Sequence, residues 1–119
     1  MDADAKLNSA LRFIQSSFMI NITSYKKDED RPVISINFDN GINLYIRYND
    51  YEEYSYQIMF SQDKYYRIRY DNYDDCWSLS TKPHHIHERG KKEAVESEMT
   101  GKPESDMPLL IEVLKIFLV

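Results

Sequence analysis

The stretch that decides the fold is YSYQIMF, residues 54–60. Its largest apolar side chains occupy every second position: Tyr54, Tyr56, Ile58 and Phe60. Because successive side chains of a β-strand point to opposite faces, this alternation predicts a strand with one face in a core and the other more polar. The strand is therefore expected to belong to a sheet that packs against other elements on one side.

Similar patterns lie before and after this stretch. Further strands are predicted over residues 19–25, 33–38, 42–48 and 65–70. Asn40 and Gly41, between the second and third of these, supply the positive φ angles of a tight hairpin turn. In the last strand, Arg67 and Arg69 share one face, which makes that face cationic. We expect an antiparallel meander of about five strands.

Helical periodicity marks both ends of the chain. Leu7, Leu11 and Ile14 recur at the spacing of an amphipathic helix over residues 5–17. Residues 109–119 are apolar nearly all round and follow Ser105 and Asp106, which can cap a helix, and Pro108, which suits a first turn. This terminal helix is expected to pack on the sheet or to be covered by another chain, a homodimer partner included.

Between the last predicted strand and this helix, residues 71–107 hold most of the irregular sequence, and residues 93–99 are expected to form a helical turn. The chain has 119 residues, of which 42% are hydrophobic and 13% aromatic, so it is long enough for one compact domain. The predicted class is α+β: an N-terminal helix, the antiparallel meander and a C-terminal helix in a single domain over residues 1–119.

Composition also limits the compartment and the cofactors. Cys76 is the only cysteine, so a disulfide framework and a cysteine-based zinc site are excluded, and the chain suits a reducing compartment, the cytoplasm. No stretch reaches the roughly 18 apolar residues of a membrane span, and residues 1–6 are polar and acidic, unlike a signal peptide. We expect a cytoplasmic protein with no membrane contact and no cofactor.

The net charge of −5 opposes general binding to a polyanion, but the charge is unevenly distributed. Residues 1–60 sum to −3, residues 61–92 to +2 and residues 93–119 to −4. All three histidines lie in the positive middle segment. An anionic ligand such as an RNA phosphate is therefore expected to bind there, through a few contacts only.

The histidines lie within KPHHIHERGKK, residues 82–92. Histidine titrates near neutral pH, so it can move the protons that RNA cleavage by an internal 2′-hydroxyl requires, and Lys82, Arg89 and Lys91 can stabilise phosphoryl charge. If the segment is extended, His85 and His87 share one face and His84 lies on the other. Two other interpretations stay open: a metal site, for which Glu88 is the one neighbouring carboxylate, and a solvated structural loop.

Arg69-Tyr70-Asp71-Asn72, followed by Pro83-His84-His85-Ile86-His87-Glu88-Arg89-Gly90, an acidic linker and a terminal helix, resembles the TumE-type toxins of prokaryotic toxin-antitoxin systems. The resemblance covers residues 54–119 in order and spacing. It implies a growth-inhibiting toxin that acts on RNA and is neutralised by a cognate helix-turn-helix antitoxin. It also implies that the residues of the motif, Tyr70, Asp71, Asn72, His84, His85 and His87, lie in the functional region, with Arg89 adjacent.

These observations lead to one hypothesis and one alternative. The hypothesis is a metal-independent endoribonuclease toxin, with catalytic residues His84, His85, His87, Arg89, Tyr70 and Asp71, and substrate-binding residues Arg67, Arg69, Lys82, Asn72 and Lys91. The alternative is a non-enzymatic interaction module that binds a partner protein through its C-terminal helix or a sheet edge. For Tyr70, Asp71 and Asn72, ordinary turn chemistry at a strand end is the competing structural interpretation.

Overall fold

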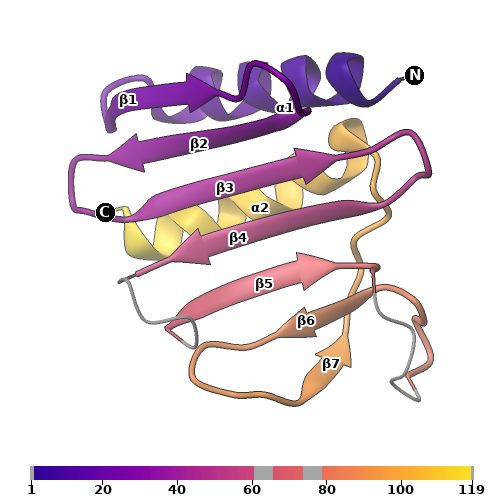
Figure 1. The fold of residues 1–119 in the computed structure, drawn as a ribbon. Helices are drawn as coiled ribbons and strands as arrows, with labels where there is room; N and C mark the ends of the chain where they lie inside the picture. The colour runs from indigo at the N-terminus through magenta and orange to yellow at the C-terminus, as the bar shows by residue number, and fades with distance from the viewer. Residues whose placement is uncertain (1, 61–65, 74–78, 119) are drawn as a thin grey trace.

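The computed structural model describes residues 2–60, 66–73 and 79–118, and the single cysteine, Cys76, lies outside these ranges. The described chain folds into two helices and seven strands (Figure 1). In chain order they are α1 (Ala3–Phe18), β1 (Ile22–Lys27), β2 (Val33–Phe38), β3 (Asn43–Tyr48), β4 (Tyr54–Met59), β5 (Arg67–Asp71), β6 (His85–His87), β7 (Ala94–Glu96) and α2 (Pro103–Phe117).

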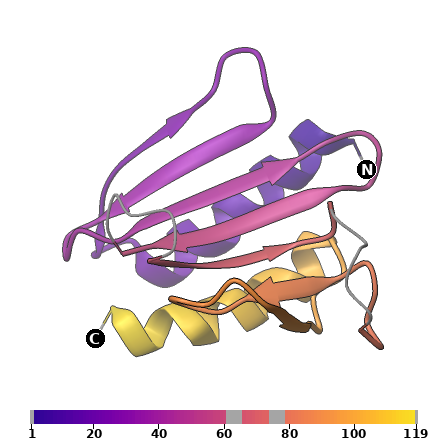
Figure 2. The same ribbon diagram turned by 60° about the horizontal axis from the view of Figure 1, so that its bottom comes forward.

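All seven strands form one antiparallel sheet whose spatial order is the chain order, so the predicted meander is confirmed. Both helices pack on the same face of the sheet, α1 beside β1 to β3 and α2 beside the middle strands (Figures 1 and 2). Among the described elements, no helix covers the opposite face, which we call the open face.

The core lies between the sheet and the helices, as the alternation of residues 54–60 predicted. Tyr54, Tyr56 and Ile58 are completely buried on the helix face. Leu44 and Ile46 on β3 pair with Ile58 and Tyr56 and are equally buried. Because the apolar residues of each strand point into this core, the residues that alternate with them point to the open face.

The predicted number of strands, about five, was too small. β6 and β7 come from the segment that was expected to be irregular, and the helical turn expected over residues 93–99 is wrong, because Val95 pairs with Ile86 in the sheet. Each of these strands has three residues. A strand that short carries too few positions for alternation to be recognised, and here the pairing with a neighbour decides the structure.

The C-terminal helix is confirmed, but it begins at Pro103 and not after Ser105 and Asp106. Asp106 lies inside the helix, is completely buried, and accepts hydrogen bonds from the backbone N–H groups of Thr100 (2.8 Å) and Gly101 (2.7 Å). Gly101 has a φ of +90°, and a Cβ atom there would lie 3.0 Å from the Tyr54 ring. This glycine lets the chain turn tightly against the core just before α2.

Asp106 also joins α2 to the sheet. Its Oδ2 accepts a 2.7 Å hydrogen bond from the Tyr56 hydroxyl, which lies 3.0 Å from the Tyr48 hydroxyl, and burial raises the pKa of both tyrosines. We expect Asp106→Ala to lower the free energy of unfolding by about 3 kcal/mol, because it leaves several buried donors without an acceptor. Urea denaturation checks this. Glu104→Ala, an exposed acid in the first turn of the same helix, should change stability far less.

Candidate active site on the open face

Five polar side chains from two adjacent strands meet on the open face. In the register of β5 and β6, Arg69 pairs with His87 and Asp71 pairs with His85, and Arg67 lies two residues before Arg69 on the same face. Directly paired residues of antiparallel strands lie on the same side of the sheet. The register of β5 and β6 thus brings the cationic strand and two of the three histidines together.

Asp71 is the centre of this group. Its Oδ1 lies 2.7 Å from Nε2 of His85, and its Oδ2 lies 2.8 Å from Nε of Arg69. The Asp71 and His85 side chains are almost fully buried, with 4% and 1% of their residue surface exposed, whereas the Arg69 side chain keeps 29%. The buried Asp71 carboxylate thus contacts a guanidinium group and an imidazole ring, which ties the side chains of β5 and β6 together.

The hydrogen bonds of His85 fix its protons. Nδ1 lies 2.8 Å from the carbonyl oxygen of Pro83, which can only accept, so Nδ1 carries a proton. The other ring nitrogen, Nε2, faces Oδ1 of Asp71 at 2.7 Å. Both ring nitrogens of His85 therefore face oxygen atoms of the protein, the Pro83 carbonyl and the Asp71 carboxylate.

His87 is in a different state. Its Nδ1 donates to the carbonyl oxygen of Lys92 at 2.9 Å, which leaves the lone pair on Nε2. Partial burial, followed by the positive charge of Arg69, lowers the pKa of His87 below the ordinary 6.5, although the Lys92 carbonyl acts in the opposite direction. The His85 and His87 rings meet edge to face at 4.9 Å. At neutral pH His87 is thus a neutral imidazole with a basic Nε2.

Strands β3 and β4 extend the site with residues that were not predicted from the sequence. A cavity of about 230 Å³ lies beside Arg69 and Asp71 on the open face, and it is also lined by Tyr45, Arg47, Ser55, Gln57 and Tyr73. Arg67 donates to Gln57 Oε1 at 2.8 Å, and Gln57 Nε2 donates to Ser55 Oγ at 3.1 Å. The alternation of residues 43–48 and 54–59 was the available signal, since it placed these side chains opposite the core.

The family model described as Toxin TumE matches residues 8–118, nearly the whole chain. The chain belongs to the TumE toxin family. No curated protein and no solved structure matches it. A toxin role follows from the TumE family, whereas the chemistry and the roles of single residues have to be argued from the site.

Two residues of the motif by which the chain resembles the TumE toxins lie on the helix face. Tyr70 is buried against Ile86 and α2, one position before Asp71 and therefore on the opposite side of β5. His84 stacks on Tyr54, and its Nδ1 lies 2.9 Å from the Tyr54 hydroxyl. The prediction that His84 lies opposite His85 and His87 is confirmed. The structure does not bring Tyr70 and His84 to the group around Asp71.

Other predicted residues also lie outside this group. The guanidinium group of Arg89 lies 4.4 Å from the ring centroids of Phe60 and Tyr66, and it donates to the Tyr66 hydroxyl at 2.6 Å. Asn72 joins the ends of two strands, because its side chain accepts from Tyr54 N and donates to the Glu52 carbonyl oxygen. These contacts give Arg89 and Asn72 structural partners.

Lys82 and Lys91 are exposed, in the segment before β6 and in the turn after it. Within the described ranges, no three His, Cys, Asp or Glu side chains gather into a metal-binding group. Neither helix of the described chain has the length and apolar character that a membrane crossing requires. The candidate site of this TumE-family chain is therefore the group formed by Arg67, Arg69, Asp71, His85 and His87, together with the adjoining cavity.

Proposed function

We propose that this toxin is an endoribonuclease that cleaves RNA on the open face of its sheet, without a metal ion. The observation that carries the proposal is the meeting of Arg67, Arg69 and a neutral His87 around a buried Asp71–His85 pair. Perturbed titratable groups beside fixed cations, on a surface with a cavity, are typical of catalytic sites. The toxin role given by the family supports a damaging activity of this kind.

The proposed reaction needs one base and a phosphate-binding cation. Nε2 of His87 takes the proton of a ribose 2′-hydroxyl, the 2′-oxygen attacks the adjacent phosphorus, and the bond to the 5′-oxygen breaks. The products are a 2′,3′-cyclic phosphate and a 5′-hydroxyl group. The departing 5′-oxygen takes its proton from water, because Nε2 of His85 faces Asp71. The hydroxide that remains takes the proton from Nε2 of His87, which restores the base. Arg69 stabilises the charge that develops on the phosphoryl oxygens.

Two features of the site bear on how RNA enters it. Nε2 of His87 exposes less than 1 Å² to solvent, so neighbouring side chains have to move aside when substrate binds. The adjoining cavity offers Tyr45 and Tyr73, on which a base can stack, beside the guanidinium group of Arg47. The cavity itself is small, about 230 Å³. Such a surface contacts only a few phosphates, which is what we expect of a protein with a net charge of −5.

A toxin that cleaves cellular RNA has to be neutralised, and we propose a cognate helix-turn-helix antitoxin in the cytoplasm as its partner. Exposed apolar side chains on α2 support a protein partner: Leu109 has 37% of its surface exposed and Ile116 has 71%. Partner binding through α2 was the alternative function derived from the sequence. In this proposal it accompanies cleavage, since α2 and the open face lie on opposite sides of the sheet (Figure 2).

The proposal is tested by neutralising two arginines of the open face that do not contact Asp71. We expect Arg47→Gln/Arg67→Gln to weaken RNA binding about tenfold, and to reduce the slope of log affinity against log salt concentration by roughly 1.4, because about 0.7 is lost with each phosphate contact to a single strand. Binding of a fluorescent oligoribonucleotide at several salt concentrations measures both quantities.

The matched control is Arg12→Gln/Arg31→Gln, which changes the net charge equally with one arginine on α1 and one in the turn after β1. Its slope and affinity should stay close to those of the original protein. Equal losses in the two double variants would mean that only the overall charge matters, and the open face would then not be the RNA-binding surface.

A further inference from the structure

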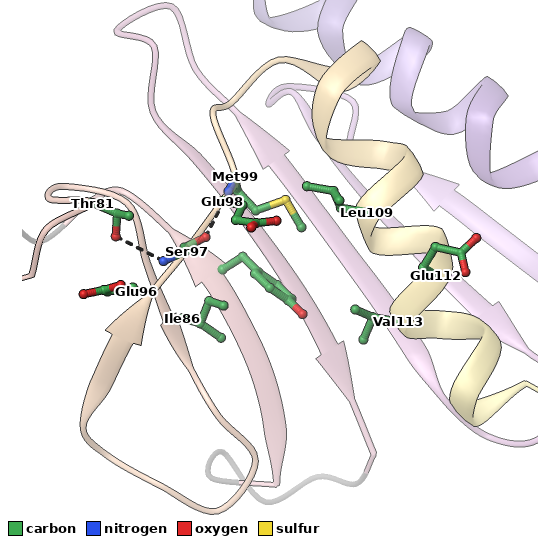
Figure 3. Close-up of a pocket in the computed structure, with 10 residues that line it drawn as sticks. Thr81, Ile86, Glu96, Ser97, Glu98, Met99, Leu109, Glu112 and Val113 are labelled. Atoms are coloured by element: carbon green, nitrogen blue, oxygen red, sulfur yellow. Dashed lines mark hydrogen bonds between the residues drawn. The ribbon is translucent and has the colours of Figure 1, made fainter.

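On the helix face, a groove of about 740 Å³ lies between α2 and the last three strands of the sheet (Figure 3). Its apolar lining comes from three strands or segments and from the helix: Tyr70, Ile86, Met99, Leu109 and Val113. Leu109 and Val113 point from α2 toward the strands (Figure 3). Leu109 nevertheless keeps 37% of its surface exposed, so the described chain leaves this apolar surface partly uncovered.

The charged residues that line the groove all have the same sign. They are Glu96 at the end of β7, Glu98 in the segment that leads to α2, and Glu112 on α2 (Figure 3). All three are exposed, and among the described residues no lysine or arginine is part of the lining. Lys115 contacts Glu112 at 3.2 Å from outside the lining, in an exposed pair that neutralises little of this charge.

From these observations we infer that the groove binds a basic amphipathic helix of the antitoxin. This inference rests on the toxin-antitoxin pairing in the proposed function. Apolar side chains of such a helix would fill the groove between α2 and β6, and its lysine or arginine residues would meet Glu98 and Glu112. A helix of about 10 Å diameter occupies roughly 400 Å³ per turn, so the groove accommodates about two turns.

The charges decide between this partner and a second copy of the toxin. A symmetric dimer through the groove would place the same patch of each subunit together and bring six carboxylates into one interface. Like charges in close contact suppress association. A basic partner is instead attracted by the carboxylates of the groove at close range and by the net charge of −5 at long range.

The experiment uses the full toxin and the full antitoxin encoded beside it, with affinity measured by titration calorimetry. We expect Glu98→Lys/Glu112→Lys to weaken the complex at least tenfold. The control is Glu29→Lys/Asp30→Lys, in the exposed turn between β1 and β2, which changes the net charge from −5 to −1 in the same way. This control should weaken the complex less than threefold, because it alters only the long-range attraction.

A second variant tests the apolar part of the groove independently. Leu109→Lys, at a position that tolerates a polar side chain because it is partly exposed, should also weaken the complex at least tenfold. Unchanged affinity in the groove variants, or an equal loss in the control, would overturn the inference. RNA cleavage by each free variant is measured in parallel. The cleavage rate should be the same in each variant as in the original toxin. If neither the original toxin nor any variant cleaved RNA, the ribonuclease proposal would be contradicted, but the inference about the groove would still stand on the affinity measurements.

Discussion

Replacing His87 with alanine is expected to lower the rate of RNA cleavage by about 100- to 10,000-fold, which is the contribution of a positioned general base. His87 carries this effect because its Nδ1 proton is held by the Lys92 carbonyl and its Nε2 is left basic. The fold should be unaffected, since the ring is only half-buried and lies outside the core. Single-turnover cleavage of a labelled RNA measures the rate.

The pH profile supplies a readout that a structural role would not give. A base acts when it is neutral, so kcat/KM should rise with pH through the pKa of His87 and level off above it. Because burial and Arg69 lower this pKa below 6.5, the rising limb should lie at lower pH than that of an ordinary histidine. The rising limb should be absent from the residual activity of His87→Ala. If His87→Ala had the same pH profile as the original toxin, another group would have to be the base.

Asp71→Ala is expected to lower the free energy of unfolding by about 3–5 kcal/mol, the usual cost of removing one partner from a buried ion pair. The change leaves the buried His85 ring and Arg69 without the carboxylate that both of them contact. Activity should fall as well, because Arg69 is no longer held in position. Urea denaturation followed by tryptophan fluorescence or circular dichroism gives the stability.

The matched control for this prediction is Asp28→Ala. Asp28 also forms an aspartate–arginine pair, with Arg31 at 3.1 Å, but Arg31 is exposed and Asp28 is only half-buried in the turn after β1. Asp28 also accepts hydrogen bonds from the backbone N–H groups of Asp30 and Arg31. Water can solvate these groups when the carboxylate is removed, so stability should fall far less than in Asp71→Ala. If Asp71→Ala were no more destabilising than Asp28→Ala, the buried pair would not organise the site as described.

The sequence predicted most of the fold because its signals were local. Alternation in residues 33–60 identified the central strands, Asn40-Gly41 identified the hairpin, and Leu7, Leu11 and Ile14 identified α1. β6 and β7 were missed because three residues are too few for a period, and their pairing partners are set by tertiary structure. The start of α2 was misplaced because Asp106 bonds backward to Thr100 and Gly101 from inside the helix.

The candidate site was predictable in part for the same reason. The alternation predicted that His85 and His87 share one face of their strand and that Arg67 and Arg69 share one face of theirs. Only the register of β5 and β6 shows that all four side chains lie on the same face of the sheet. The same alternation already separates Tyr70 from Asp71, although sequence proximity had grouped them. The ion pairs of Asp71 and the ring contacts of Arg89 depend on distances across the sheet, which local patterns do not contain.

The chemistry of the RNA ends tests the proposed cleavage mechanism most directly. Purified toxin is incubated with a labelled RNA in the presence of a metal chelator, and the fragments are analysed by mass spectrometry. We expect fragments that end in a 2′,3′-cyclic phosphate and begin with a 5′-hydroxyl, formed at least 100-fold more slowly by His87→Ala but at the original rate by Arg12→Gln. Intact RNA with the original toxin, or the same fragments at the original rate from His87→Ala, would contradict the proposed mechanism.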